Sequence, residues 1–184
     1  MKPWKISEAK TQTAKGQADT FLHLIDARGD APPLREAADN TAPSGYVLRY
    51  WLAETMQDKL QGAAVLFRHP WRPSGVFSLQ IGVVPEKRRQ GIGSALFQEA
   101  LTVASSLHAQ RLLTEVNGSN AEALAFAIRH GFTLTQQFRT MVLDVAAFPF
   151  ARFASLVEHV AAESGIHLFS FAEAGDIRCR IGAW

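Results

Sequence analysis

Hydrophobic and polar positions near the start of the chain predict one helix and then a loop. Within residues 6–28, Phe21, Leu22 and Ile25 recur at helical spacing. Residues 29–45 are rich in Pro, Asp, Asn and Gly, which favour turns and loops. We therefore expect an N-terminal helix followed by a segment without regular structure.

Three strand-like runs follow this loop, at residues 46–53, 63–68 and 76–84. Polar or Pro-containing turns separate them, as expected between short strands. Because short connections join antiparallel neighbours, the pattern predicts an antiparallel meander.

Helix and strand patterns alternate in the next part of the chain. We expect a helix at residues 94–107, a strand at 111–116, and a second helix that Asn120 caps and that runs to His130. Gly131 supplies a left-handed stop for this second helix. The first helix has the apolar stripe of a helix packed on a sheet, formed by Leu96, Ala100, Leu101, Ala104 and Leu107. The order of elements indicates an α/β domain of the α+β type.

Two further strand-like runs, at residues 132–136 and 138–145, predict a hairpin that closes this domain. Phe148-Pro149 then marks a break, because the residue before proline avoids helical geometry. The first domain is therefore expected to comprise residues 1–145.

Residues 146–184 form an extension with a pattern of its own. An amphipathic helix is expected at residues 153–163, with Gly165 as its stop and a strand-like run at 166–171. These apolar side chains should be buried against the first domain or a partner chain, so a homodimer is possible.

Composition favours a soluble globular protein, because 47% hydrophobic and 20% charged residues are close to the average for that class. Nineteen basic and 17 acidic residues leave a net charge of +2, and only residues 87–89 form a basic cluster. That cluster is too small for a nucleic-acid surface. The chain has a single cysteine, Cys179, and no apolar run typical of a signal peptide or a membrane span. We expect a cytoplasmic protein that binds neither nucleic acid nor membrane.

Several kinds of catalytic site are disfavoured by the residues present. The six histidines include no pair at metal-site spacing, and no Gly-x-Ser-x-Gly motif occurs. We therefore expect neither a bound metal nor serine-hydrolase chemistry.

The most informative segment is residues 83–94, where a strand ends in a basic, glycine-containing turn before a helix. A helix N-terminus exposes unpaired N–H groups, and glycines let a diphosphate approach them closely. Gly91-Ile92-Gly93 lacks the third glycine of a dinucleotide-binding fold, and no Gly-Lys-Ser/Thr of a P-loop is present. A tight turn with no ligand is the structural alternative.

Two motifs in this region together resemble the GNAT superfamily of N-acetyltransferases. The first is Arg88-x-x-Gly91-x-Gly93 after a strand, which fits the family's cofactor signature of Gln or Arg, two residues, Gly, one residue, and Gly or Ala. The second is a strand followed by Asn120-x-x-Ala123 and a helix that ends in Gly-Phe. The resemblance covers about residues 46–145.

This resemblance implies a mixed, largely antiparallel sheet that is flanked by helices and splayed between its fourth and fifth strands. Acetyl-CoA would bind in the splay as co-substrate, without a metal. Main-chain groups of Ile81, Val83 and Val84 would pair with pantetheine, and Asn120 would support the cofactor. The family's pattern places the pyrophosphate on the N–H groups of the turn and helix start, namely Arg88, Arg89, Gln90, Gly91, Ile92, Gly93 and Ser94.

The resemblance also suggests a general base. In the branch of the family that acetylates the N-terminal alanine of ribosomal proteins, a Glu five residues before the motif Asn serves as base, and Glu115 has this spacing from Asn120. A solvent-facing strand residue is the structural alternative for Glu115. The family's usual acid is a Tyr seven residues after the Asn, where this chain has Ala127.

The resemblance implies transfer of an acetyl or other acyl group from CoA to a primary amine of a small molecule or a protein N-terminus. The absence of the Tyr leaves a second possibility, a non-catalytic acyl-CoA-binding module with a regulatory role. The extension at residues 146–184 resembles the linker and first strand of the second domain in tandem GNAT proteins. We expect a vestigial or truncated second domain there.

Overall fold

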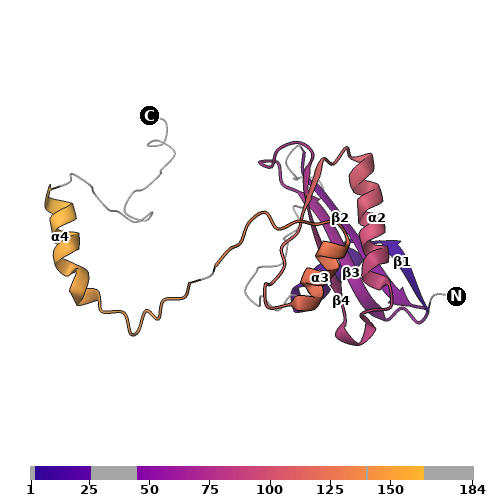
Figure 1. Ribbon diagram of the computed structural model, residues 1–184, viewed down its shortest axis with the longest axis horizontal. Coiled ribbons are helices and arrows are strands. Elements are labelled where there is room, and N and C mark those ends of the chain that lie inside the picture. Colours follow the sequence, from indigo (N-terminus) through magenta and orange to yellow (C-terminus); the bar gives the residue numbers. More distant parts are fainter. Residues whose placement is uncertain (1–2, 26–44, 140, 164–184) are drawn as a thin grey trace. The chain divides into compact units, whose positions relative to one another are not determined.

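The computed structural model describes residues 3–25, 45–139 and 141–163. The chain forms two compact units, residues 1–133 and 134–184, each of which is described by itself. The first unit contains β1 (Trp4–Glu8), α1 (Gln12–Ile25), β2 (Val47–Thr55), β3 (Leu60–Arg68), β4 (Val76–Val83), the 3₁₀ turn η1 (Pro85–Lys87), α2 (Ile92–Ser106), β5 (Arg111–Leu113) and α3 (Ala121–Arg129) (Figure 1).

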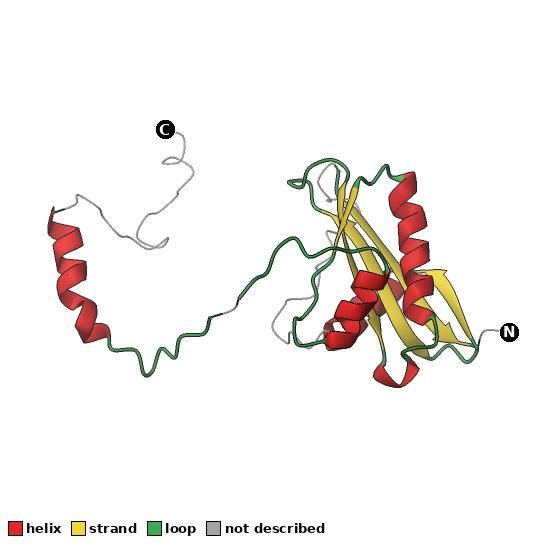
Figure 2. Ribbon diagram, viewed as in Figure 1, coloured by secondary structure: helices red, strands yellow, loops and turns green. Residues whose placement is uncertain are grey.

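The strands, drawn in yellow in Figure 2, form one sheet. Their order in the sheet is β1-β2-β3-β4-β5. The first four pair antiparallel, which confirms the predicted meander, and β5 pairs parallel to β4. The β4–β5 ladder contains only Val76–Arg111, Phe77–Leu112 and Ser78–Leu113. Beyond it the two strands diverge, so the sheet is splayed between its fourth and fifth strands as expected.

Helices cover both faces of the sheet. Strand alternation sends Trp51, Ala64 and Leu66 to one face, where they pack with α2 residues such as Leu96. The opposite alternation sends Tyr50, Leu52 and Val65 to the face that carries α1. The result is a three-layer arrangement with two apolar cores.

Glycines in the central strands allow α1 and α2 to approach the sheet closely. A Cβ on Gly62 would lie 3.1 Å from Ile92 Cγ2 and 3.2 Å from Leu96 Cδ1 of α2. On the other face, a Cβ on Gly82 would lie 3.2 Å from Leu22 Cδ2 of α1. Both glycines are therefore packing residues that fix the distance between the layers.

The expected helix at residues 6–28 is wrong in its first part, because Trp4–Glu8 forms β1 and pairs with β2. Trp4 and Ile6 alternate with polar neighbours and pack against the core on the α2 side. This short alternation is obscured by the helix-forming residues after it, and pairing with β2 outweighs their propensity. The helix itself begins after Thr11, whose Oγ1 accepts a hydrogen bond from the Ala14 N–H at 3.2 Å. Residues 26–28 lie outside the described part.

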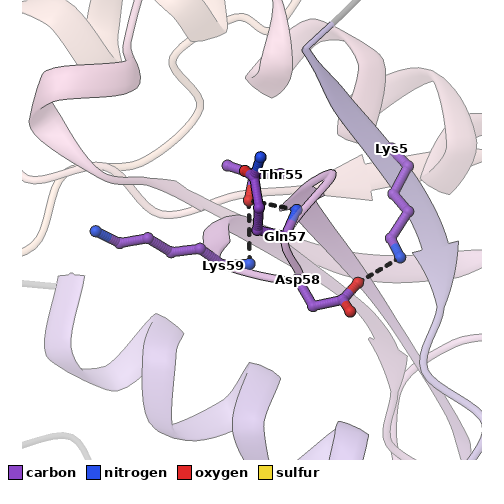
Figure 3. A network of polar contacts seen from close by, with 5 residues as sticks. All are labelled: Lys5, Thr55, Gln57, Asp58 and Lys59. Atoms are coloured by element: carbon purple, nitrogen blue, oxygen red, sulfur yellow. Dashed lines mark hydrogen bonds and ion pairs between the residues drawn. The ribbon is translucent and has the colours of Figure 1, made fainter.

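Polar contacts hold the β2–β3 turn against the edge of β1 (Figure 3). Thr55 Oγ1 accepts from the N–H groups of Gln57 and Lys59, both at 3.2 Å. Asp58 adopts a left-handed conformation and its carboxylate lies 2.6 Å from Lys5 Nζ. The pKa of Lys5 is raised by its hydrogen bond to Asp58 and by the charge of that carboxylate.

The strand expected at residues 111–116 ends at Leu113, because β4 diverges there and no other described segment pairs with β5. The closing hairpin at 132–136 and 138–145 is also wrong, since the described residues of these runs form no strand. Their junction, Gln136-Gln137, has none of the Gly, Asn or Asp residues that tight hairpin turns need. Alternating apolar residues alone do not give a segment a neighbouring strand to pair with.

In the second unit, the 3₁₀ turn η2 (Phe150–Phe153) leads into α4 (Ala154–Glu163), which confirms the expected helix. Aromatic rings pack around η2, with Phe148 stacked on Phe153 at 5.2 Å and in edge contact with Phe150 at 4.8 Å. The run at 166–171 lies outside the described residues. None of the helices in the described part of the chain is long and apolar enough to cross a membrane.

Candidate active site

The second half of β4 offers an open edge. On one side it pairs with β3 as far as Val83, whereas on the other the β5 ladder stops at Ser78. The Val84 N–H donates to the Gln61 carbonyl at 3.0 Å, which fixes the alternation of main-chain groups along β4. Ile81 and Val83 therefore direct their N–H and C=O groups away from β3 and towards the splay.

A turn with left-handed residues connects this edge to α2. We call residues 84–91 the glycine loop. It contains η1, then Arg89 with φ +62° and Gly91 with φ +82°. A left-handed conformation costs an ordinary residue about 1–2 kcal/mol, so Arg89 stores strain here and Gly91 avoids it.

The start of α2 presents a set of unpaired donors. Its first main-chain hydrogen bond runs from the Ala95 N–H to the Gly91 carbonyl, at 3.0 Å. The N–H groups of residues 91–94 therefore have no acceptor within the helix. Together with the positive end of the helix dipole, they form an anion-binding arrangement next to the cations of residues 87–89.

The two motif glycines have different surroundings. A Cβ on Gly91 would have no heavy atom within 4 Å, so the space in front of its main chain is open. A Cβ on Gly93 would lie 3.2 Å from Phe126 Cε2 of α3 and 3.7 Å from Val83 Cγ2. Gly91 thus leaves room for a ligand, whereas Gly93 leaves room for α3.

Arg88 ties the glycine loop to its neighbours. Its Nε donates to the Val83 carbonyl at 3.3 Å, and its Nη1 lies 3.1 Å from Glu122 Oε2 of α3. Its main-chain N–H donates to Pro85, and the Val84 N–H is held by Gln61. Among the residues expected to contact a cofactor, Val84 and Arg88 therefore have main-chain donors already engaged inside the protein.

Asn120 and Glu115 lie on the other side of the splay. Asn120 Oδ1 accepts from the Ala123 N–H at 3.0 Å, which confirms its capping role at α3. Glu115 is exposed and follows the end of β5 by two residues, between half-buried Thr114 and Val116. Its position after the last ladder pair places it where β5 leaves β4.

No tyrosine takes the position of the family's usual acid. Ala127 is buried in α3. Tyr50 lies between β2 and α1, where its hydroxyl donates to Asp19 Oδ1 at 3.2 Å, and Tyr46 packs against His69. Both tyrosines therefore make contacts within the fold, away from the splay.

One polar pair near the glycine loop was not predicted from the sequence. Ser94 Oγ lies 3.0 Å from His130 Nε2. This hydrogen bond joins the first turn of α2 to the C-cap residue of α3. Phe97 and Phe126 pack against the His130 ring at 4.6 and 4.4 Å. Burial lowers the pKa of His130, and the neighbouring charge of Arg129 lowers it further. The sequence signal was a histidine directly before the Gly-Phe pair.

Comparison with known proteins agrees with this arrangement. The model of the acetyltransferase (GNAT) family matches residues 17–132, which span β2 to α3 and most of α1. The chain belongs to the GNAT acetyltransferase family. GNAT enzymes use acetyl-CoA as donor, so the chain is an N-acetyltransferase that moves an acetyl group from acetyl-CoA to an amine.

Relatives of this GNAT chain have named activities. L-2,4-diaminobutyric acid acetyltransferase of Nocardia farcinica is 27% identical over 80% of this chain and 79% of its own length. Mycothiol acetyltransferase of Cellulomonas flavigena is 29% identical over 70% of this chain but only 38% of its own length.

A solved structure shares the fold. It is an aminoglycoside N-acetyltransferase in complex with CoA, which matches with a TM-score of 0.56 at 15% identity. The match covers 76% of this chain and 94% of that protein. At this level of identity the likeness supports the GNAT fold and nothing finer.

The packing of Gly93 on α3 gives a first prediction. Gly93→Val should lower the free energy of unfolding by about 1–3 kcal/mol, because the added methyl groups overpack the contact with Phe126. Urea titration measures the change. Gly118→Val is the matched control, since a Cβ there has nothing within 4 Å. Equal stability of the two variants would show that α3 does not lie against Gly93.

Proposed function

We propose that acetyl-CoA binds in the splay, with pantetheine along the open edge of β4 and the diphosphate on the start of α2. The observation that carries this proposal is that two sets of main-chain groups flank the glycine loop: the outward groups of Ile81 and Val83 on the open edge of β4, and the N–H groups of residues 91–94, which have no acceptor within α2. The Ile81 carbonyl and the Val83 N–H would pair with pantetheine amides as a neighbouring strand does. The Val83 carbonyl already accepts from Arg88.

The diphosphate would lie in front of Gly91. Its oxygens would accept from the N–H groups of Gly91, Ile92, Gly93 and Ser94, with Arg89 and Gln90 exposed beside them. Arg88 and Val84 then hold the loop in place, and Asn120 fixes the start of α3 by its cap. Acetyl-CoA supplies a thioester whose carbonyl carbon is open to attack by an amine.

Glu115 serves as the general base in this proposal. The acceptor arrives as an ammonium, and its proton passes to the Glu115 carboxylate before the nitrogen attacks the thioester carbon. The C–N bond forms, the nitrogen releases its second proton to water, the C–S bond breaks, and CoA leaves as a thiolate. With Ala127 in place of a tyrosine, the thiolate takes its proton from water, which is adequate because a thiol has a pKa of about 8.5.

The acceptor is proposed to be a small polar molecule with a primary amine. The named relatives support this choice, since one acts on diaminobutyric acid and the other bears the name of mycothiol. A panel of amino acids, diamines, amino sugars and short peptides, assayed by release of free thiol from acetyl-CoA, tests this class. Turnover confined to peptides would contradict it.

Gly91 is the position at which CoA binding is most sensitive to a side chain. Gly91→Val should weaken CoA binding by more than about tenfold, because the branched side chain occupies the space of the diphosphate and disfavours the left-handed backbone that shapes the glycine loop. Calorimetric titration with CoA measures the loss. Gly16→Val, whose Cβ also has no heavy atom within 4 Å, is the control and should bind CoA normally. Unchanged affinity in Gly91→Val would place the cofactor elsewhere.

The role of Glu115 is tested by removing its charge. Glu115→Gln should retain CoA affinity but lower turnover by about 10²–10⁴-fold, the usual contribution of a general base. Glu99→Gln, an exposed carboxylate on α2, should behave as wild type. If Glu115→Gln has the wild-type rate, bulk water and not Glu115 accepts the proton of the acceptor ammonium.

The second unit is proposed to begin a GNAT-like extension whose apolar side chains contact a second copy. Phe150 is 62% exposed and Leu156 is 57% exposed, next to the ring cluster around η2. Contiguous apolar surface of this kind marks an interaction site. A homodimer would cover it.

This contact can be removed by shortening the chain. A protein that ends after Val145 should be a monomer by light scattering, whereas the full chain should be a dimer, because the shortened protein lacks the ring cluster and α4. Phe150→Ser together with Leu156→Ser should do the same in the full chain, whereas Glu158→Ala on α4 should not. The same number of chains per particle and the same melting temperature for all four proteins would exclude the contact.

A further inference from the structure

The bond between Ser94 and His130 joins two features of the site. Ser94 is the third residue of α2 and belongs to the four residues whose N–H groups point out of the helix start. His130 is the C-cap residue that follows α3, and its main-chain N–H donates to the carbonyls of Phe126 and Ala127. The bond of 3.0 Å therefore places a titratable ring next to the proposed diphosphate position.

Packing fixes the orientation of the His130 ring. Phe97 of α2 and Phe126 of α3 pack against it, with ring planes tilted by 41° and 51°. Between these rings, His130 Nε2 lies at hydrogen-bond distance from Ser94 Oγ. A ring held in this way has few other orientations. What Ser94 can do is then determined by whether Nε2 carries a proton, which depends on the tautomer of the neutral ring and on whether the ring is charged.

A serine hydroxyl has one proton to donate. When Nε2 carries no proton, the Ser94 hydroxyl donates to it and turns only lone pairs towards an incoming anion. When Nε2 carries a proton, the ring donates to Ser94 Oγ, and the hydroxyl proton is available for a diphosphate oxygen. The two states differ in whether Ser94 attracts or repels the cofactor.

We propose that His130 is a positioning residue for CoA, which donates from Nε2 to Ser94 so that the Ser94 hydroxyl donates to the diphosphate. The inference rests on the proposed binding of the diphosphate at the start of α2. It adds a residue outside the glycine loop to the cofactor site, and it links CoA binding to the uptake of a proton.

The charges around His130 determine the direction of this link. From α3, Arg129 is the charged neighbour, and the Arg88–Glu122 pair lies two turns earlier on the helix face that carries Phe126 and His130. From α2, the ring meets Ser94 and Phe97, which carry no charge. Burial and Arg129 lower the pKa of His130 without ligand, whereas a bound diphosphate favours the protonated ring and raises its pKa.

The pH dependence follows from these two shifts. Because the pKa of His130 is higher in the complex than in the free protein, CoA binds most tightly below the free pKa. Affinity then falls as the pH rises towards the pKa of the complex, by up to about tenfold per pH unit between the two values. Above both values, CoA binds to the neutral ring and the dependence disappears.

Calorimetric titration of the full chain with dephospho-CoA at pH 5.5 to 8.5 tests the proposal, because this probe carries the diphosphate but not the 3′-phosphate, which itself titrates near pH 6. Wild type should lose affinity across the range. His130→Gln, whose amide always donates, should bind with no pH slope and with an affinity near the wild-type value at low pH. His130→Leu and Ser94→Ala should each bind about five- to tenfold more weakly than wild type at low pH, also without a slope.

Two comparisons make the outcome decisive. Adding His130→Leu to Ser94→Ala should cause no further loss, because the ring acts through the hydroxyl. Pantetheine, which lacks the diphosphate, should bind all variants alike. A wild-type affinity that is independent of pH, or a pH slope that persists in His130→Gln, would overturn the role of His130. If Gly91→Val also leaves binding of dephospho-CoA unchanged, the proposed cofactor site itself is wrong.

Discussion

The divergence of β4 from β5 after the Ser78–Leu113 pair is the constraint on which the rest of the site depends. A closed ladder would satisfy the main-chain groups of Ile81 and Val83 inside the sheet and leave nothing for a cofactor. Because the ladder stops, one strand edge stays open in the middle of a packed domain. A pantetheine chain has the amide groups to complete that edge, and we propose that the cofactor binds to these main-chain groups.

This opening is useful only if its surroundings are rigid. Leu22 and Ile25 of α1 pack on Gly82 from one face, and Ile92 and Leu96 of α2 pack on Gly62 from the other. Arg88 then links the end of β4 to α3 through Val83 and Glu122. The glycine loop is thus held between the end of β4, the start of α2 and α3. The N–H groups at the start of α2 therefore keep their direction without a ligand.

The sequence predicted the parts of this arrangement that have local causes. The meander, the helix stripe around Leu96, the Asn120 cap and the left-handed Gly131 all follow from spacing or from backbone chemistry within a few residues. β1 was missed because Trp4 and Ile6 become a strand only through pairing with β2. The predicted hairpin after Phe132 failed for the converse reason, since alternation does not supply a partner. The bond between Ser94 and His130 joins residues 36 positions apart, which no local pattern reveals.

The central claim is that acetyl-CoA completes the open edge of β4 and the start of α2. Residue-resolved amide hydrogen exchange, measured on the full chain with and without CoA, tests it most directly. The account predicts that exchange slows at Val83 and at Gly91 to Ser94, whose N–H groups gain acceptors from the cofactor. The Val84 and Arg88 N–H groups, already bonded to Gln61 and Pro85, should change least. Slowing confined to other segments, with Val83 and the α2 start unaffected, would contradict the account.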